Sequence, residues 1–220
     1  MPFADLPVFA PLTAGRQPRT LLSLALLVLA SLCVGRAGAM PAAEQLIHRQ
    51  AELLKQGLAE AGAHASDPAE LERLVNRVIA PHVDFNRFAR LVLGRYWRTL
   101  SREDRRRFEQ GLERLVIRTY STALAGASDL DIRYPDVPAR SRPGRVVVPT
   151  VISSVGNPPV KVNYKLYERE GVWRVYDVVI EGISMAVNYR SLMAERIRRQ
   201  GIDAVIDGLA GSSAALATGR

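Results

Sequence analysis

The chain has 220 residues, a formal net charge of +8 and a single cysteine, Cys33. One cysteine excludes an intrachain disulfide, so the stability of the fold depends on packing. The positive charge suits anionic lipid headgroups or nucleic acid as partners.

The first 39 residues have the layout of a secretory signal peptide. Arg16 and Arg19 precede an apolar run of 14 residues, 21–34, and Ala37-Gly38-Ala39 follows it. Because a membrane-spanning helix needs about 20 apolar residues, an uncleaved anchor is the weaker alternative. We therefore expect cleavage after Ala39 and a secreted mature chain that has no cysteine.

The leader carries three arginines and one aspartate, so the mature chain keeps a net charge of +6. The densest basic run is Arg105-Arg106-Arg107, and acidic residues flank it on both sides. This mixture of signs favours a solvated helix face over a nucleic-acid interface, so we expect no nucleic-acid partner.

The first half of the mature chain shows helical periodicity that is interrupted by capping residues and prolines. Asp67 and Ser101 are suited to cap helices, and Pro81 ends one. We expect four helices, at residues 42–62, 67–81, 85–94 and 101–125.

After Gly126 the pattern changes to β-branched and aromatic runs divided by proline and glycine. The runs predict four strands, at residues 132–134, 146–155, 160–169 and 172–180. Their short connections favour an antiparallel meander. Pro149 cannot donate a ladder hydrogen bond, so its strand should lie at an edge or carry a bulge there.

Ser184 is suited to cap a further helix that ends at Gly201. We expect a last short helix at 204–209 and a disordered tail at 211–220. Helices first, a sheet later and a closing helix predict one α+β domain over residues 40–210, with the helices packed on one face of a twisted antiparallel sheet.

The histidines form no recognisable metal motif. His48, His64 and His82 lack the spacing of zinc ligands, so we expect neither a metal nor another cofactor. The sequence around Ser184 looks like a nucleophile elbow but lacks its second glycine. We interpret Ser184 as a helix cap and Asp177 as a structural carboxylate, and a small periplasmic hydrolase that uses these two residues is the alternative.

Apolar side chains alternate along three of the predicted strands, which indicates one buried face. The inward positions are Val146, Val148 and Ile152, then Val160, Val162, Tyr164 and Leu166, then Trp173, Val175 and Val179. Alternation indicates burial but not what fills the buried space, so it is compatible both with an ordinary core and with a cavity.

Several phrases of the sequence resemble the MlaC, or toluene-tolerance, family. They are FNRFARLVLGRYWR at 85–98, VIRTY at 116–120, WRVYDVVIEGIS at 173–184 and NYRS at 188–191. They occur in the family's order and spacing, and the likeness covers about residues 42–210.

This resemblance implies a non-catalytic periplasmic carrier that encloses the two acyl chains of a phospholipid in an apolar cavity between helices and sheet, and so maintains outer-membrane lipid asymmetry. The implied partners are an inner-membrane ABC transporter with an MCE subunit and an outer-membrane lipoprotein complex. A hopanoid- or isoprenoid-associated carrier of the same family is the alternative. From strand alternation and helix faces we expect the lipid-binding residues to include Val92, Tyr96, Val116, Tyr120, Val148, Tyr164 and Val175.

Overall fold

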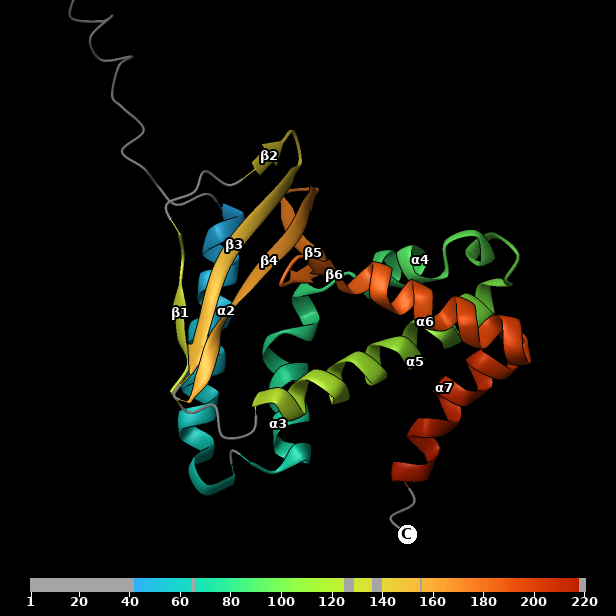
Figure 1. Cartoon of the computed structure of the whole chain (residues 1–220), viewed down its shortest axis with the longest axis horizontal. Coiled ribbons are helices and arrows are strands. Elements are labelled where there is room, and N and C mark those ends of the chain that lie inside the picture. The colour runs from blue at the N-terminus through green and yellow to red at the C-terminus, as the bar shows by residue number, and fades with distance from the viewer. Residues whose placement is uncertain (1–41, 65, 125–128, 136–139, 155, 218–220) are drawn as a thin grey trace, which may run out of the picture. The chain divides into compact units, whose positions relative to one another are not determined.

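The computed structural model describes residues 42–64, 66–124, 129–135, 140–154 and 156–217 (Figure 1). The predicted signal peptide, residues 1–39, lies outside the described residues. The helices are α2 (Ala42–Ala61), α3 (Pro68–Val78), α4 (Phe85–Leu93), α5 (Arg102–Ser121), α6 (Met185–Gln200) and α7 (Ile202–Ala217). Short 3-10 helices are η1 (Gly62–His64), η2 (Ala80–His82), η3 (Gly94–Arg98) and η4 (Thr122–Leu124). The strands are β1 (Asp131–Arg133), β2 (Arg140–Arg142), β3 (Arg145–Ser154), β4 (Asn157–Arg169), β5 (Val172–Ile180) and β6 (Ile183–Ser184).

The helix starts are fixed by the capping residues that the sequence predicts. Asp67, Ser101 and Ser184 each accept a hydrogen bond from a backbone N–H in the first turn, at 2.9, 3.0 and 3.3 Å. Each bond satisfies one of the amide groups that a helix N-terminus leaves without an intrahelical partner. Gly201 ends α6 with a φ of 85°, a conformation that glycine adopts without strain. Within the described residues, no helix is long and apolar enough to cross a membrane.

The strands form one antiparallel sheet in the order β1-β3-β4-β5-β6, and β2 also pairs with β3. β1 pairs with residues 151–153 of β3, and β2 pairs with residues 145–147. β3 is an interior strand, and its bulge lies at Ile152–Ser154 instead of at Pro149, so the prediction of an edge or a bulge at the proline is wrong for the strand as a whole. Among the described residues, Pro149 falls between the stretches that pair with β1 and with β2, and there it has a partner on β4 alone.

A bulge changes which side chains of β5 face the helices. Tyr176 is an extra residue that has no partner on β4. As a result, Val175 and Val178 face the same side of the sheet although they are three residues apart. Val178, opposite Tyr164, takes the inward place predicted for Val179, so that single prediction is wrong.

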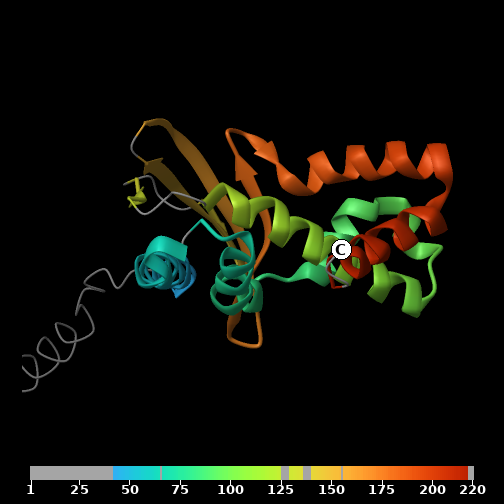
Figure 2. The same ribbon diagram turned by 90° about the horizontal axis from the view of Figure 1, so that it is seen from below.

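The predicted α+β class is confirmed, and the helices form two groups around the sheet (Figure 2). α2 packs across the sheet through Ala43 and Ile47. α4, α5, α6 and α7 surround a core of their own, in which Phe108, Leu112 and Met193 are fully buried. This second group meets the sheet at β5, because α4 and α6 both contact that strand.

The C-terminal helix is longer than the sequence predicts. α7 continues to Ala217, whereas we expected a short helix at 204–209. The predicted boundary at residue 210 therefore falls inside this helix, and residues 218–220 of the expected tail lie outside the described part of the chain. The run of alanine, glycine and serine after Leu209 lacks the apolar periodicity from which a helix is recognised.

Candidate functional site

Three of the predicted lining residues, Val148, Tyr164 and Val175, lie together on the sheet face beneath α2. Val148 is opposite Tyr164 in the pairing of β3 and β4. Val148 and Val175 are buried in one cluster with Ala43 and Ile47, and Tyr164 packs against it. Burial raises the pKa of Tyr164 because the phenolate would be poorly solvated there. The sheet side of the site is an apolar surface that includes the neutral phenol of Tyr164.

The other four predicted residues, Val92, Tyr96, Val116 and Tyr120, belong to the helical cluster. Val92 is fully buried, and the other three are partly buried against the same cluster. The hydroxyl of Tyr189 on α6 lies near Tyr120: burial raises the pKa of Tyr189, and the neighbouring Tyr120 raises it further. The predicted set is therefore divided between a sheet surface and a helix surface.

Val178 joins these two surfaces. It packs against both the sheet cluster and the helical cluster, which Ile180 also contacts from β5. The predicted residues missed Val178, because the bulge at Tyr176 inverts the alternation on which the assignment of faces depended. No feature of the sequence identified that bulge in advance.

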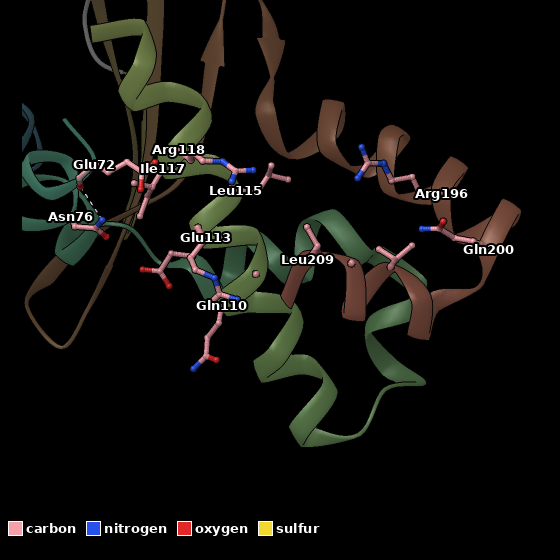
Figure 3. A pocket seen from close by; sticks show the side chains of 14 residues that line it. Glu72, Asn76, Gln110, Glu113, Leu115, Ile117, Arg118, Arg196, Gln200 and Leu209 are labelled. Carbon is pink, nitrogen blue, oxygen red and sulfur yellow. Dashed lines mark hydrogen bonds between the residues drawn. The ribbon is translucent and has the colours of Figure 1, made fainter. Parts of the chain in front are cut away.

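A pocket of about 730 Å³ opens beside the helical cluster, between α3, α5, α6 and α7 (Figure 3). Its apolar lining includes Leu115, Ile117, Val205 and Leu209. The polar side chains around it are Glu72, Asn76, Gln110, Glu113, Arg114, Arg118, Arg196 and Gln200. None of the seven predicted lining residues faces this pocket. The residues that line it come from four helices. Their spacing along each helix is the spacing of any solvent-exposed helix face, so the sequence did not predict this pocket.

A second pocket, of about 640 Å³, lies between η2, the start of α4 and the β4–β5 turn. Asp84 and Tyr167 line it, and the Tyr167 hydroxyl donates a hydrogen bond to the Asp84 carboxylate. The Arg87 guanidinium stacks over Tyr167 at 4.1 Å and over Tyr176 at 4.7 Å from the ring centroids. Asp84 also caps α4, so these contacts fix the helix against the sheet.

The two catalytic candidates, Asp177 and Ser184, contact each other at the start of α6. Ser184 Oγ donates to Asp177 Oδ2 at 2.7 Å, and Lys165 Nζ donates to the same oxygen at 2.8 Å. Asp177 Oδ1 accepts from the backbone N–H of Ala186 at 3.1 Å. The carboxylate is 4 % exposed, and these donors satisfy it as a buried charge requires. Both side chains are thus bound into the junction between β5 and α6.

The histidines lie apart from these residues. His82, in η2, has a lowered pKa because burial disfavours its charged form and Arg174 repels the proton. Within the described residues, no group of three or more histidine, aspartate or glutamate side chains is placed to hold a metal ion.

Comparison with known proteins places these features in a family. The family model for the MlaC protein matches residues 49–211. The toluene tolerance protein ttg2D of Pseudomonas putida is 28% identical over 167 residues, which cover 74% of this chain and 77% of that protein. The intermembrane phospholipid transport system binding protein MlaC of Haemophilus influenzae is 27% identical over 143 residues, 64% of this chain and 67% of that one.

A solved structure extends the likeness to three dimensions. It is the phospholipid-binding protein of Ralstonia solanacearum in complex with a phospholipid, with a TM-score of 0.70 and 26% sequence identity. The likeness covers 80% of this chain and 98% of that chain.

Proposed function

The chain belongs to the MlaC family, and from this premise we propose that it binds phospholipid and carries it between the outer and inner membranes. The observation that carries the proposal is the likeness to a chain in complex with a phospholipid, because it covers 98% of that chain with a TM-score of 0.70. The carrier needs no catalytic group, and the structural bonds of Asp177 and Ser184 agree with that role.

We place the acyl chains along the sheet and helix surfaces that meet at Val178. The proposed lining is the set Val92, Tyr96, Val116, Tyr120, Val148, Tyr164 and Val175, with Val178 added. For the chains to enter, the two surfaces have to separate or repack, because Val92 and Val148 are each only 1 % exposed. Such a separation costs little free energy when each apolar contact that the two surfaces lose is replaced by an apolar contact with an acyl chain.

The energetics of transfer favour such a lining. Burying the roughly 30 methylenes of two acyl chains at about 0.8 kcal/mol each amounts to about 24 kcal/mol, which exceeds the ceiling of non-covalent affinity. The lipid already has this stabilisation in a membrane, so a carrier has to offer an equally dry surface. Loading and unloading are then nearly balanced, and contacts with the donor or acceptor determine the direction.

The cellular setting is part of the proposal. Residues 1–39 direct the chain to the periplasm and are removed there, and the mature protein exchanges lipid with an inner-membrane ABC transporter carrying an MCE subunit and with an outer-membrane lipoprotein complex. Intact-mass measurement on protein from the envelope fraction tests the first part. A mass that still includes the leader would refute cleavage after Ala39.

Mass spectrometry of the lipid extracted from the natively purified protein tests the function itself. We expect a stoichiometric two-chain phospholipid. A hopanoid or another isoprenoid in its place would overturn the phospholipid assignment but keep a carrier. Protein without lipid that hydrolyses phospholipid esters would replace the carrier by an enzyme.

A further inference from the structure

Arginines are concentrated in the segment that connects α4 to α5. Residues 90–106 contain six arginines and two acidic residues, a net charge of +4, whereas the predicted mature chain as a whole carries +6. Two thirds of the excess positive charge therefore belongs to 17 residues. Five of the six arginines are exposed, and we call them the arginine surface: Arg90, Arg95, Arg98, Arg102 and Arg106.

The connection between α4 and α5 lies at the end of the helical group that is remote from the sheet (Figures 1 and 2). Its arginines are held around Trp97. The guanidinium carbons of Arg90 and Arg105 lie 5.6 and 5.5 Å from the centroid of the indole ring. Arg105 also donates to the carbonyl oxygens of Trp97 and Arg98, at 2.8 and 3.3 Å. These contacts fix the backbone that carries the arginine surface.

The charge of the arginine surface is not neutralised by neighbouring carboxylates. Within the described residues, none of its five arginines forms an ion pair. Asp104 accepts a hydrogen bond from Ser101 at 2.6 Å and pairs with Arg107. Arg107 also pairs with Asp207, at 2.6 Å. Glu103 adds one exposed negative charge, so the surface keeps an excess of positive charge towards solvent.

The stability of α5 does not explain the position of these arginines. Arg102 is the first residue of the helix, and Arg98 precedes its cap, Ser101. The N-terminus is the positive end of the helix dipole, where acidic side chains are favourable and basic ones are unfavourable. The arrangement therefore costs some helix stability, and an external anion would remove that cost.

The arginine surface exposes no large apolar side chain to a partner. The exposed large apolar side chains of the described residues all lie outside residues 90–106. Of the two aromatic residues in this segment, Trp97 is 7 % exposed, and Tyr96 lies beneath the guanidinium of Arg95. Protein interfaces usually have an apolar core, and single-stranded nucleic acids stack on exposed aromatic rings. A flat layer of negative charge needs neither feature, because it attracts spread arginines without a complementary shape.

We propose that the arginine surface binds directly to the face of a bilayer that contains anionic phospholipids, with this end of the helical group against the headgroups. The choice of a lipid surface rests on the proposed function, which brings the protein to membranes. Arginine binds phosphate oxygens through paired N–H groups. Each basic residue held near an anionic membrane strengthens binding about five-fold, and salt weakens this attraction by screening it. The binding is therefore reversible, as a protein that leaves one membrane for another requires.

Co-flotation of the mature protein with vesicles tests this inference. One preparation is phosphatidylcholine alone, and the other is equal parts phosphatidylcholine and phosphatidylglycerol with the same acyl chains. At low salt we expect the wild type to bind the anionic vesicles at least about ten-fold more strongly than the neutral ones. Most of this difference should disappear at about 1 M salt, where charges are screened within about 3 Å.

Two triple variants locate the binding surface. The test variant replaces three arginines of the arginine surface: Arg98→Gln, Arg102→Gln and Arg106→Gln. It should bind anionic vesicles about ten- to a hundred-fold more weakly than the wild type, because three attractions are lost. The matched control removes the same charge from exposed positions of the sheet: Arg142→Gln, Arg145→Gln and Lys161→Gln. It should bind within about three-fold of the wild type, since these side chains face away from the bilayer. Circular dichroism and the thermal midpoint show that both variants are folded.

Three results would overturn the inference. The wild type could bind both vesicle preparations equally, or the two triple variants could lose equal affinity, which would mean that only the net charge matters. A wild type that ignores the vesicles but binds double-stranded DNA would assign the arginines to a nucleic acid instead.

A second measurement separates the inference from its premise. The three arginines of the test variant lie outside the proposed acyl-chain lining, so this variant should co-purify with as much phospholipid as the wild type. Wild-type protein that carries no lipid but binds anionic vesicles through the arginine surface would refute the proposed function and leave this inference standing. Wild-type protein that carries lipid but binds neither vesicle preparation would refute the inference and leave the proposed function standing.

Discussion

The hydroxyl of Ser184 donates to the carboxylate of Asp177 at 2.7 Å and, through the same oxygen, accepts the backbone N–H of Val187 at 3.3 Å. One side chain thus caps α6 and fixes a buried charge at the end of β5. Lys165, on the neighbouring strand, completes the group at 2.8 Å. This arrangement holds the helical group against the sheet at β5, the strand whose Val178 contacts both apolar surfaces.

Asp177→Asn should lower the free energy of unfolding by about 1.5–3 kcal/mol, because a charge-assisted hydrogen bond to Lys165 is lost. In either orientation, the introduced amide NH2 would also face a group that can only donate, either Lys165 Nζ or the backbone N–H of Ala186. Urea unfolding followed by circular dichroism measures the change. Asp131→Asn is the matched control: its carboxylate pairs with Arg133 at an exposed site and should matter by less than about 1 kcal/mol. Equal effects of the two substitutions would contradict the buried network.

Ser184→Ala should cost at least about 1 kcal/mol, the typical effect of losing a helix cap, because the hydrogen bond to the buried Asp177 carboxylate is lost as well. Ser191→Ala, at an exposed position within the same helix, should cost nothing, since alanine is the better helix former. Neither Ser184→Ala nor Asp177→Asn should abolish lipid transfer below the lowered thermal midpoint. A variant that kept wild-type stability and lipid occupancy yet lost a measurable phospholipase or esterase turnover would favour the hydrolase.

The helix caps and strand limits could be predicted because short-range chemistry determines them. Asp67, Ser101 and Ser184 satisfy backbone groups only two or three residues away, so their role does not depend on the tertiary fold. Pro149 likewise excludes a ladder bond wherever its strand lies. These local features made it possible to predict α3, α5, α6 and the sheet from the sequence.

The site was harder to predict because it depends on contacts between distant elements. The bulge at Tyr176 moves Val178 inward in place of Val179, and this follows from the pairing of β4 with β5 instead of from the alternation within β5. In the same way, Arg118 and Arg196 come to one pocket from different helices. Helical spacing predicts which residues share a face, but not which helix that face meets.

Acidification should destabilise the protein in part through His82. Burial and Arg174 lower the pKa of His82 from its ordinary value of 6.5, so the folded state resists protonation. The unfolded chain takes up this proton as the pH falls below about 6.5, and stability is lost from there downward, whereas it is fully present above. His82→Gln should therefore reduce the loss of stability between pH 7.5 and pH 5.5, measured by urea unfolding at both values. An equal loss in wild type and variant would show that His82 contributes nothing.

Gly111→Ala should destabilise the contact between α5 and α7. A Cβ at Gly111 would lie 2.7 Å from Leu209 Cβ, so the helices would have to move apart at a cost of about 1–3 kcal/mol. Gly208→Ala, on α7, is the control: its Cβ would meet nothing within 4 Å, and it should stabilise the helix by roughly 0.5–1 kcal/mol. Denaturant unfolding should therefore show a lower free energy of unfolding for Gly111→Ala and a higher one for Gly208→Ala. A gain in stability in both variants would mean that α7 does not pack against Gly111 as described.

Tryptophan at Val148 or at Val175 should lower the amount of bound lipid while the fold persists. Both side chains are buried on the sheet face proposed to contact acyl chains, at 1 % and 6 % exposed. The larger tryptophan side chain does not fit into the packed core. It would therefore occupy the space between the sheet and the helices that the lipid requires. The amount of phospholipid that co-purifies with each variant, divided by the amount of folded protein, measures the effect.

Val172→Trp is the matched control, because it lies on β5 but its side chain is 51 % exposed. It should keep the occupancy of the wild type. In an ordinary solid core, the two buried tryptophans would only destabilise, by about 1–3 kcal/mol, and the folded fraction would still carry its full complement of lipid. In a lipid-binding surface, occupancy falls more than stability does. Unchanged occupancy in both buried variants would therefore remove Val148 and Val175 from the lining and place the acyl chains elsewhere in the fold.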